Sequence, residues 1–309
     1  MSKVSAGSVI FSVAKRFLLP WHLWKVLSLQ RNRKKTERVF DDAQLKLYAQ
    51  LLPGGFLHYG YFDNPSIEPM EISINDVYRA QTRYAELLLS KLPASSGLRI
   101  LDIGCGTGAM AKMMLDMGHH PTALTPDKTQ AHHIRSIYND IPVVECKFED
   151  FNGDAYAQTF DVVITSESLQ YLKQAIALPL IDKILKPGGK WIACDYFRIQ
   201  EAHEKSGHFF SEFQKNLSEA GMSIRFQQDI TANILPTIAY VHSFANRIGL
   251  PLLSFGIDKL QTKAPGIHYA LQELIPFVQQ KIDKNLITVN PDVFARQKQY
   301  LLMEIERIK

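Results

Sequence analysis

The sequence predicts an α/β fold in which a doubly wound, mostly parallel sheet carries helices on both faces. Short β-rich runs alternate with helical stretches from about residue 98 onward. The first run ends in a glycine-rich turn over residues 104–108 that opens a helical pattern. Later, Pro187-Gly188-Gly189 separates a helical stretch from another β-rich run, as a turn signal does. Strands that alternate with helices pair in parallel through right-handed crossovers.

The expected elements follow in chain order. Before the alternation begins, helical patterns cover 38–51 and 74–92. Five strands are expected at 98–103, 121–124, 143–148, 161–165 and 190–197, with helices between them at 109–117, 128–138 and 169–185. A helix at 211–220 and two more strands, at 222–230 and 300–308, complete the pattern. Together these elements predict a Rossmann-like sheet of seven strands.

A long insert separates the last two expected strands. Its roughly 70 residues are too many for a loop in a compact domain, and they are rich in large apolar side chains. We therefore expect a helical cap before the last strand. The expected organisation is a helical N-terminal lid over 1–96, a core domain over 97–231, the cap over 232–298 and the last core strand over 299–309.

Composition limits the class of protein. Of 309 residues, 46% are hydrophobic and 21% are charged, which is enough apolar material for one large domain with a smaller cap. The formal charge of +4 is too small to favour a nucleic-acid partner. Cys105, Cys146 and Cys194 lack the paired spacing of a zinc site or a disulfide framework. We expect no metal site and a reducing, cytoplasmic location.

The N-terminal segment is apolar and aromatic over 9–29, but basic residues and Pro20 interrupt every run long enough to span a bilayer. Neither a transmembrane helix nor a secretory signal is expected. A basic run, 31–35, follows. Two interpretations of residues 9–36 stay open: an interfacial segment in peripheral contact with a membrane, or a helix packed on its own domain with a solvated basic face.

The motif Leu101-Asp102-Ile103-Gly104-Cys105-Gly106-Thr107-Gly108 is the sharpest candidate for a binding site, because glycines let the backbone approach a ligand closely. Gly104, Gly106 and Ala109 also fit the spacing of a dinucleotide site. However, Asp102 stands two positions before the first glycine, where its carboxylate would repel a pyrophosphate and attract a cation. The motif therefore favours S-adenosylmethionine, with a nicotinamide or flavin dinucleotide as the alternative.

At these residues the chain resembles the class I S-adenosylmethionine-dependent methyltransferases: 101–108 looks like their first motif, and 184–190 looks like their late strand approach. Residues 123–130 are similar to the G-L-T-L-S-x-x-Q run of cyclopropane fatty acid synthases and their small-molecule methyltransferase relatives. Residues 57–62 look like the H-Y-G-Y/W motif of tocopherol-type and sarcosine-type enzymes. The resemblance implies S-adenosylmethionine as cofactor, with contacts from His58, Asp102, Gly104, Cys105, Gly106, Gly108, Thr125, Pro126, Gln130, Phe148, Glu149 and Ser166.

The resemblance to cyclopropane synthases stops at their base. Those enzymes hold a bicarbonate with a cysteine, a glutamate and a histidine, and the matching positions here are Tyr59, Gln170 and Asp195. We therefore expect ordinary methyl transfer, and cyclopropane-type methylene transfer to an unsaturated lipid becomes the alternative.

Methyl transfer is an in-line displacement on an already activated sulfonium, so the protein chiefly orients the nucleophile and excludes water. A hydroxyl, phenol or electron-rich carbon acceptor would also benefit from a general base. The candidates are His58, Glu167, Tyr171 and His208, and each has the alternative of a purely structural hydrogen bond.

The apolar insert, with Phe209, Phe210 and Phe213 before it, suggests a lipophilic small-molecule acceptor under the cap, methylated on oxygen, nitrogen or carbon. The alternative is that these side chains only pack the cap. Two other classes stay open: a nicotinamide-dependent oxidoreductase, and a catalytically silent, membrane-associated binding protein. The sequence leaves the oligomeric state open.

Overall fold

The computed structural model describes residues 19–22, 24, 25, 28, 54–199, 206–272 and 274–308. The chain divides into two units, Met1–Asp42 and Ala43–Lys309. Most of the segment 9–36, and the whole helix expected at 38–51, lie outside the described residues. In the first unit, Trp21 and Trp24 lie in short helical pieces and are 78% and 73% exposed. No helix in the described part of the chain is both long and apolar enough to cross a bilayer.

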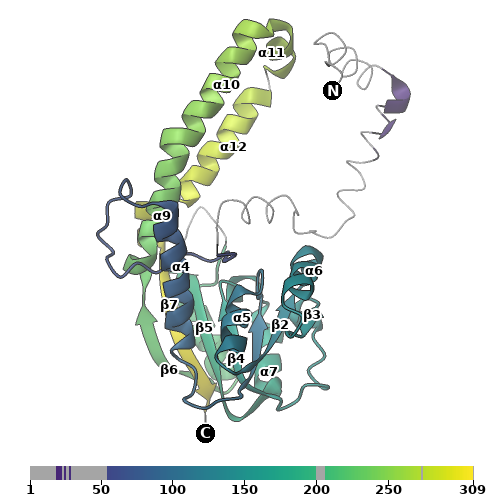
Figure 1. Ribbon diagram of the computed structural model, residues 1–309, viewed down its shortest axis with the longest axis vertical. Coiled ribbons are helices and arrows are strands. Elements are labelled where there is room, and N and C mark those ends of the chain that lie inside the picture. Colours follow the sequence, from purple (N-terminus) through teal and green to yellow (C-terminus); the bar gives the residue numbers. More distant parts are fainter. Residues whose placement is uncertain are drawn as a thin grey trace. The chain divides into compact units, whose positions relative to one another are not determined.

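The second unit is built on a seven-stranded sheet with the order β3-β2-β1-β4-β5-β7-β6 (Figure 1). Neighbouring strands pair in parallel from β3 to β5, and β7 is antiparallel to both β5 and β6. The doubly wound, mostly parallel prediction is thus confirmed. The bounds are β1 Arg99–Ile103, β2 His120–Thr125, β3 Val143–Glu145, β4 Phe160–Ser166, β5 Leu185–Arg198, β6 Met222–Asp229 and β7 Lys298–Arg307.

Helices cover both faces of the sheet and create two hydrophobic cores. Ile100 and Ile192 pack in one core and their chain neighbours Leu101 and Trp191 in the other, because successive strand residues point to opposite faces. The first core also takes side chains from α4 (Ile74–Leu89), α5 (Ala109–Asp116), α6 (Lys128–Ile137) and α9 (Thr231–Phe244). The second takes them from α7 (Gln174–Ile184) and α8 (Phe210–Glu219).

Several expected boundaries were wrong where a turn interrupts the pattern. The third strand ends at Glu145, and Phe148 instead begins a 3-10 turn, η1 (Phe148–Asp150). A second such turn, η2 (Leu169–Tyr171), precedes α7, which therefore begins later than predicted. The Pro187-Gly188-Gly189 turn lies inside β5, because Leu185 already pairs with Phe160 before the register shifts.

The insert between β6 and β7 is helical. It contains α9, the π-helical turn η3 (Ala245–Gly249), α10 (Leu250–Lys263), α11 (Pro265–Leu271), α12 (Leu274–Thr288) and α13 (Pro291–Gln297). Ile234 of α9 and Phe294 of α13 pack in the first core. By contrast, α10 and α12 bury no residue, and Phe255 and Phe277 on them are 61% and 63% exposed. The apolar residues of α10 and α12 therefore lie exposed or half-buried at the surface.

Candidate active site

The glycine-rich turn joins β1 to α5 at the point where the strand order reverses between β1 and β4, which is where doubly wound sheets bind ligands. Gly104, Gly106 and Gly108 all have positive φ angles, of 78°, 56° and 84°. A Cβ on Gly104 would lie 2.5 Å from the Cβ of Ser168. The backbone amides of Gly104 and Cys105 donate to the carbonyl of Leu124 at 2.8 and 3.2 Å. The turn is thus fixed against β2 and the end of β4.

Asp102 lies at the carboxyl end of β1 and is 1% exposed. Neither of its carboxylate oxygens has a hydrogen-bond partner among the described residues. Burial raises the pKa of Asp102 to about 7, because nothing compensates the desolvated charge. A buried, unpartnered carboxylate next to a glycine turn fits the ammonium group of a cationic ligand such as S-adenosylmethionine.

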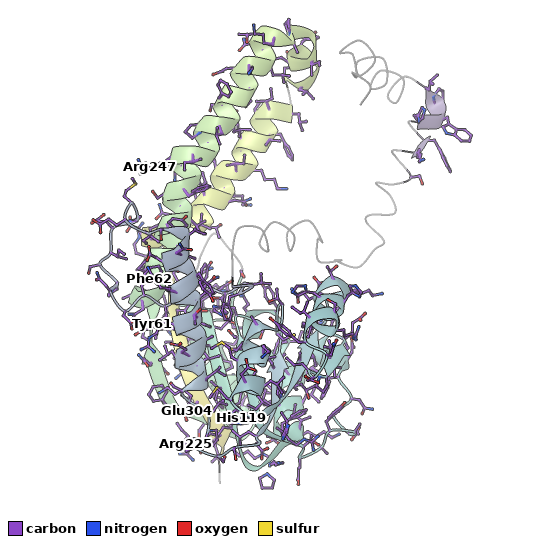
Figure 2. All side chains as sticks on the ribbon, viewed as in Figure 1. Tyr61, Phe62, His119, Arg225, Arg247 and Glu304 are labelled. Atoms are coloured by element: carbon purple, nitrogen blue, oxygen red, sulfur yellow. The ribbon has the colours of Figure 1, made fainter. Side chains whose placement is uncertain are left out.

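The segment 54–62 lies over the glycine turn. The Thr107 hydroxyl donates to the carbonyl of Gly55 at 2.5 Å, and Leu57 lies 3.5 Å from the position of a Cβ on Gly106. Farther along, the amide of Tyr61 donates to Ala80 of α4 and that of Phe62 to Asn233 of α9 (Figure 2). These contacts bring the predicted N-terminal motif to the end of the sheet that carries the glycine turn.

The imidazole of His58 is buried and stacks on Tyr84, with ring centroids 4.3 Å apart. Its Nδ1 donates to the carbonyl of Tyr59 at 2.7 Å, which leaves Nε2 as an acceptor with no partner among the described residues. Burial lowers the pKa of His58 to about 4, so the ring is neutral at physiological pH.

Gln81 was not predicted from the sequence. It lies on the buried face of α4, and its side-chain amide donates to the carbonyl of His58 at 2.7 Å while its Oε1 stays unpartnered among the described residues. The sequence signal that could have identified Gln81 is a polar residue on the buried face of an amphipathic helix. The unpartnered atoms of Gln81, His58 and Asp102 are all hydrogen-bond acceptors, so they suit a ligand that brings donors and positive charge.

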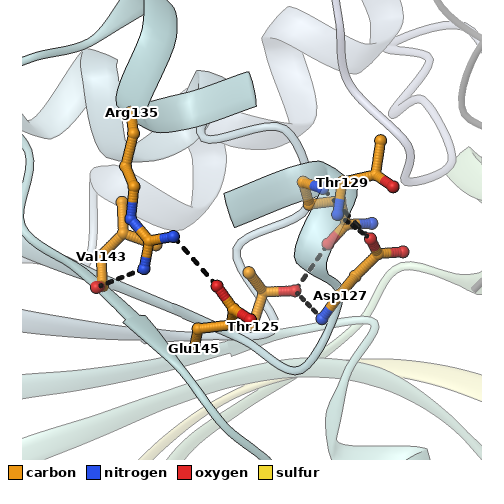
Figure 3. A network of polar contacts seen from close by, with 7 residues as sticks. Thr125, Asp127, Thr129, Arg135, Val143 and Glu145 are labelled. Atoms are coloured by element: carbon orange, nitrogen blue, oxygen red, sulfur yellow. Dashed lines mark hydrogen bonds and ion pairs between the residues drawn. The ribbon is translucent and has the colours of Figure 1, made fainter. Parts of the chain in front are cut away.

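Thr125, at the end of β2, contacts Gln130 of α6. The family resemblance predicts both residues as cofactor contacts. The Thr125 hydroxyl donates to the Gln130 side chain at 2.7 Å (Figure 3). Asp127 caps α6 by accepting from the amides of Thr129 and Gln130 at 2.7 and 3.1 Å, and Pro126 is exposed beside it. Arg135 of the same helix pairs with Glu145 at the end of β3 at 2.9 Å. The first turn of α6 is therefore held firmly at this edge.

Phe148 and Glu149 follow β3 and lie on η1. Phe148 is buried and stacks on Phe151, with centroids 6.1 Å apart. One carboxylate oxygen of Glu149 accepts from the amide of Lys173, the residue before α7, at 2.9 Å. Glu149 therefore anchors the start of α7.

Glu167 directly follows β4 and has a positive φ of 50°. Its Oε1 accepts from the amide of Tyr59 at 2.8 Å and from the hydroxyl of Tyr300 at 2.6 Å. Burial raises the pKa of Glu167 to about 7, although these two hydrogen bonds oppose the rise. A carboxylate with a pKa near neutrality is suited to accept a proton.

Two buried tyrosines, Tyr84 and Tyr300, belong to the same group of side chains as Glu167. Neither was predicted from the sequence as a site residue. The hydroxyls of Tyr84 and Tyr300 lie 3.1 Å apart, and Ser166 donates to that of Tyr84 at 3.2 Å. Aromatic rings surround them: Tyr59 lies edge-on to Tyr300 and to Phe294, with centroids 6.3 and 6.4 Å apart. Tyrosines 216 residues apart in the chain give no local pattern by which to recognise the pair.

The other two proposed bases lie elsewhere. His208 is half-buried, and its Nε2 is 3.1 Å from the carbonyl of Leu169; burial lowers its pKa. Tyr171 is 70% exposed at the end of η2. Phe213 packs with Trp191 and Phe197 in the second core, on the opposite face of the sheet from Tyr84 and Tyr300, so it was wrongly predicted as part of an acceptor pocket. Cys105 is buried, and burial raises its thiol pKa well above the usual value.

An open hollow of about 590 Å³ lies near the opposite end of the strands, lined by residues that include Gln158, Asp182 and Arg307. Arg307 bonds to the Asp182 side chain and to the carbonyl of Leu185 at 3.3 Å. Because its charges are satisfied within the chain and it is remote from the glycine turn, this hollow is not the reaction site.

Known methyltransferases are similar to this chain in sequence. Residues 101–193 match a family model described as a methyltransferase domain. The O-methyltransferase resE of Aspergillus sclerotiorum is 26% identical over 245 residues, which cover 72% of this chain and 90% of the relative. The 27-O-demethylrifamycin SV methyltransferase of Amycolatopsis mediterranei is 27% identical over 217 residues, covering 63% of this chain and 76% of the relative.

A solved structure shares the fold. The geranyl diphosphate C-methyltransferase of Streptomyces coelicolor A3(2), in complex with Mg2+, geranyl diphosphate and S-adenosyl-L-homocysteine, superimposes with a TM-score of 0.61 at 18% identity, covering 86% of this chain and 94% of that one. The matched domain includes the glycine turn and the strand ends described above. This chain is a class I S-adenosylmethionine-dependent methyltransferase that acts on a small molecule.

Proposed function

We propose that the enzyme methylates a hydroxyl group of a lipophilic small molecule, with Glu167 as the general base. The observation that carries the proposal is the Glu167 carboxylate, held by Tyr59 and Tyr300 at the carboxyl end of β4 with a pKa of about 7. The two relatives compared above are both named as acting on oxygen, which supports a hydroxyl as the acceptor.

The same proposal assigns the cofactor contacts. Asp102 accepts the ammonium group, the turn from Gly104 to Gly108 cradles the methionyl part, and Thr125, Gln130 and Phe148 adjoin the adenosine, with Cys105, Pro126, Glu149 and Ser166 nearby. The cofactor supplies a methyl group already activated by a positive sulfur. His58, on the segment 54–62, contributes a neutral acceptor, Nε2. This assignment leaves the removal of the acceptor proton to Glu167.

Aromatic side chains around Glu167 support a lipophilic acceptor. Tyr59, Tyr300, Phe294 and Tyr196 come from four separate segments and contact one another edge-on. Such walls bind apolar or ring-bearing molecules and keep water from the reacting atoms. His208 and Tyr171 remain weaker candidates for the base, since the first is bonded to a main-chain carbonyl and the second is exposed.

The test uses S-adenosylmethionine with a deuterated methyl group and a panel of phenols, isoprenoid alcohols and hydroxylated polyketides. Mass spectrometry should detect the label on oxygen, and Glu167→Gln should lower kcat by about 10²-fold or more. The matched control, Glu219→Gln, changes an exposed carboxylate on α8 that pairs with Lys215 at 3.9 Å, and it should keep the wild-type kcat. Label on carbon or nitrogen, or full activity of Glu167→Gln, would contradict the proposal.

Peripheral membrane contact through residues 9–36 is part of the proposal. The exposed Trp21 and Trp24, and the basic sequence that follows, support it, because tryptophan favours the membrane interface and basic residues favour anionic lipid. Flotation with anionic liposomes should retain the full chain and lose a chain lacking residues 1–36. Equal flotation of both would contradict this contact.

A further inference from the structure

The backbone of Tyr300 is anchored by hydrogen bonds to two residues at the start of α9. Tyr300 lies on β7 in register with Tyr196, and its ring is fully buried. Its amide donates to Thr231 at 2.8 Å, and its carbonyl accepts from the amide of Ile230 at 2.9 Å. These bonds fix the backbone of β7 at Tyr300. The phenol therefore reaches Oε1 of Glu167 from a rigid support.

Two more hydroxyls lie behind that of Tyr300, and the Tyr84 hydroxyl also donates to the carbonyl of Cys194 at 3.5 Å. Ser166 donates to Tyr84, and the hydroxyl of Tyr84 lies 3.1 Å from that of Tyr300. Tyr300 must itself donate to Oε1 of an ionised Glu167, which only accepts. The hydrogen bond donated by Tyr300 stabilises the charge of the Glu167 carboxylate in a site of low dielectric. Three hydroxyls meet here within a core that is otherwise largely apolar.

The two oxygens of Glu167 are not equivalent. Oε1 takes both hydrogen bonds, from the Tyr59 amide and from Tyr300, and Oε2 has no donor among the described residues. In the described part of the chain only Glu167 and Gln158 have positive φ without being glycine. Such a conformation persists where the surroundings over-determine it, and it is common at functional sites.

We propose that Tyr300 is a positioning residue, which holds Oε1 of Glu167 so that Oε2 is the atom that takes the acceptor's proton. This inference rests on the proposed role of Glu167 as base. In the reaction, the acceptor oxygen forms a bond to the methyl carbon while the bond from sulfur to that carbon breaks. The hydroxyl proton moves to Oε2, the sulfur keeps its electron pair as a neutral thioether, and Tyr300 keeps its own proton.

The test follows the Glu167 carboxyl directly, with no acceptor needed. Protein labelled with ¹³C at the glutamate side-chain carboxyls is titrated by NMR, and Glu167→Gln identifies the signal. Because the hydrogen bond from Tyr300 lowers the pKa of Glu167, Tyr300→Phe should move the midpoint up by about one to two pH units. An unchanged midpoint in Tyr300→Phe overturns the proposal.

Controls separate this inference from the proposed function. Tyr156→Phe removes a phenol whose ring stacks on Phe151 and Phe160, and it should leave the Glu167 midpoint unchanged. With an acceptor from the labelled panel, Tyr300→Phe should lower kcat with little change in KM and shift the acid limb of the pH profile upward. Failure of the base assignment would appear instead as full turnover by Glu167→Gln, whatever the midpoint in Tyr300→Phe.

Discussion

Oε1 of Glu167 lies 2.8 Å from the amide nitrogen of Tyr59, although 108 residues separate them in the chain. Through this bond the segment that covers the glycine turn also holds the residue at the end of β4. His58, adjacent to Tyr59, is linked to α4 through Gln81. The segment that covers the glycine turn is therefore also connected to the proposed base.

Asp102→Asn should weaken the binding of S-adenosylhomocysteine about 30-fold or more at pH 8, where Asp102 is ionised. The asparagine keeps the shape but removes the charge that faces the ligand's ammonium, a loss of about 2 kcal/mol or more. Isothermal titration calorimetry measures the change. Asp116→Asn, on an exposed helix end, is the matched control and should bind as the wild type does.

The same carboxylate should cost stability in the ligand-free protein at high pH. The folded state raises the pKa of Asp102 from 3.8 to about 7, so the folded state binds this proton more tightly than the unfolded chain does. Its penalty is absent below about pH 4, grows as pH rises and is complete above pH 7, where it reaches at most about 4 kcal/mol.

Asp102→Asn should accordingly increase the free energy of unfolding, relative to wild type, more at pH 8 than at pH 5. Urea titrations at the two pH values measure this difference. The same gain at both pH values would show that Asp102 is not held with a raised pKa.

Gly104→Ala should destabilise the protein more than Gly188→Ala, although both glycines have a φ of 78°. The alanine at 188 meets nothing within 4 Å, so it carries only the backbone strain of about 1–2 kcal/mol. At 104 the new Cβ would also lie 2.5 Å from Ser168. Thermal unfolding and titration with S-adenosylhomocysteine compare the two; equal losses of stability would contradict the close approach at Gly104.

The sequence was sufficient to predict the fold, and the candidate residues of the glycine turn lie in one motif that could be recognised in it. Alternating β-rich and helical runs predicted the sheet, and Asp102 with its glycines appeared in a single stretch of eight residues. Tyr84 and Tyr300 could not be predicted, because strand pairing between β5 and β7 and the packing of α4 bring them together. The end of the third strand was misplaced because Phe148 is a buried apolar residue of a 3-10 turn. In the sequence, such a residue looks the same as a buried residue of a strand.

The sequence also did not show which apolar residues in and before the insert are buried. Substitutions of Phe213, before the insert, and of Phe255, within it, test the burial that the structure gives them. Phe213→Ala should destabilise the protein by about 3–5 kcal/mol, since the ring is fully buried against Trp191 and Phe197. Phe255→Ala should change the free energy of unfolding by less than about 0.5 kcal/mol, because its ring is 61% exposed on α10, a helix with no buried residue. Urea unfolding of dilute protein compares the two. A large loss in Phe255→Ala would mean that α10 packs against another surface in solution, since helices that bury nothing gain little stability from packing.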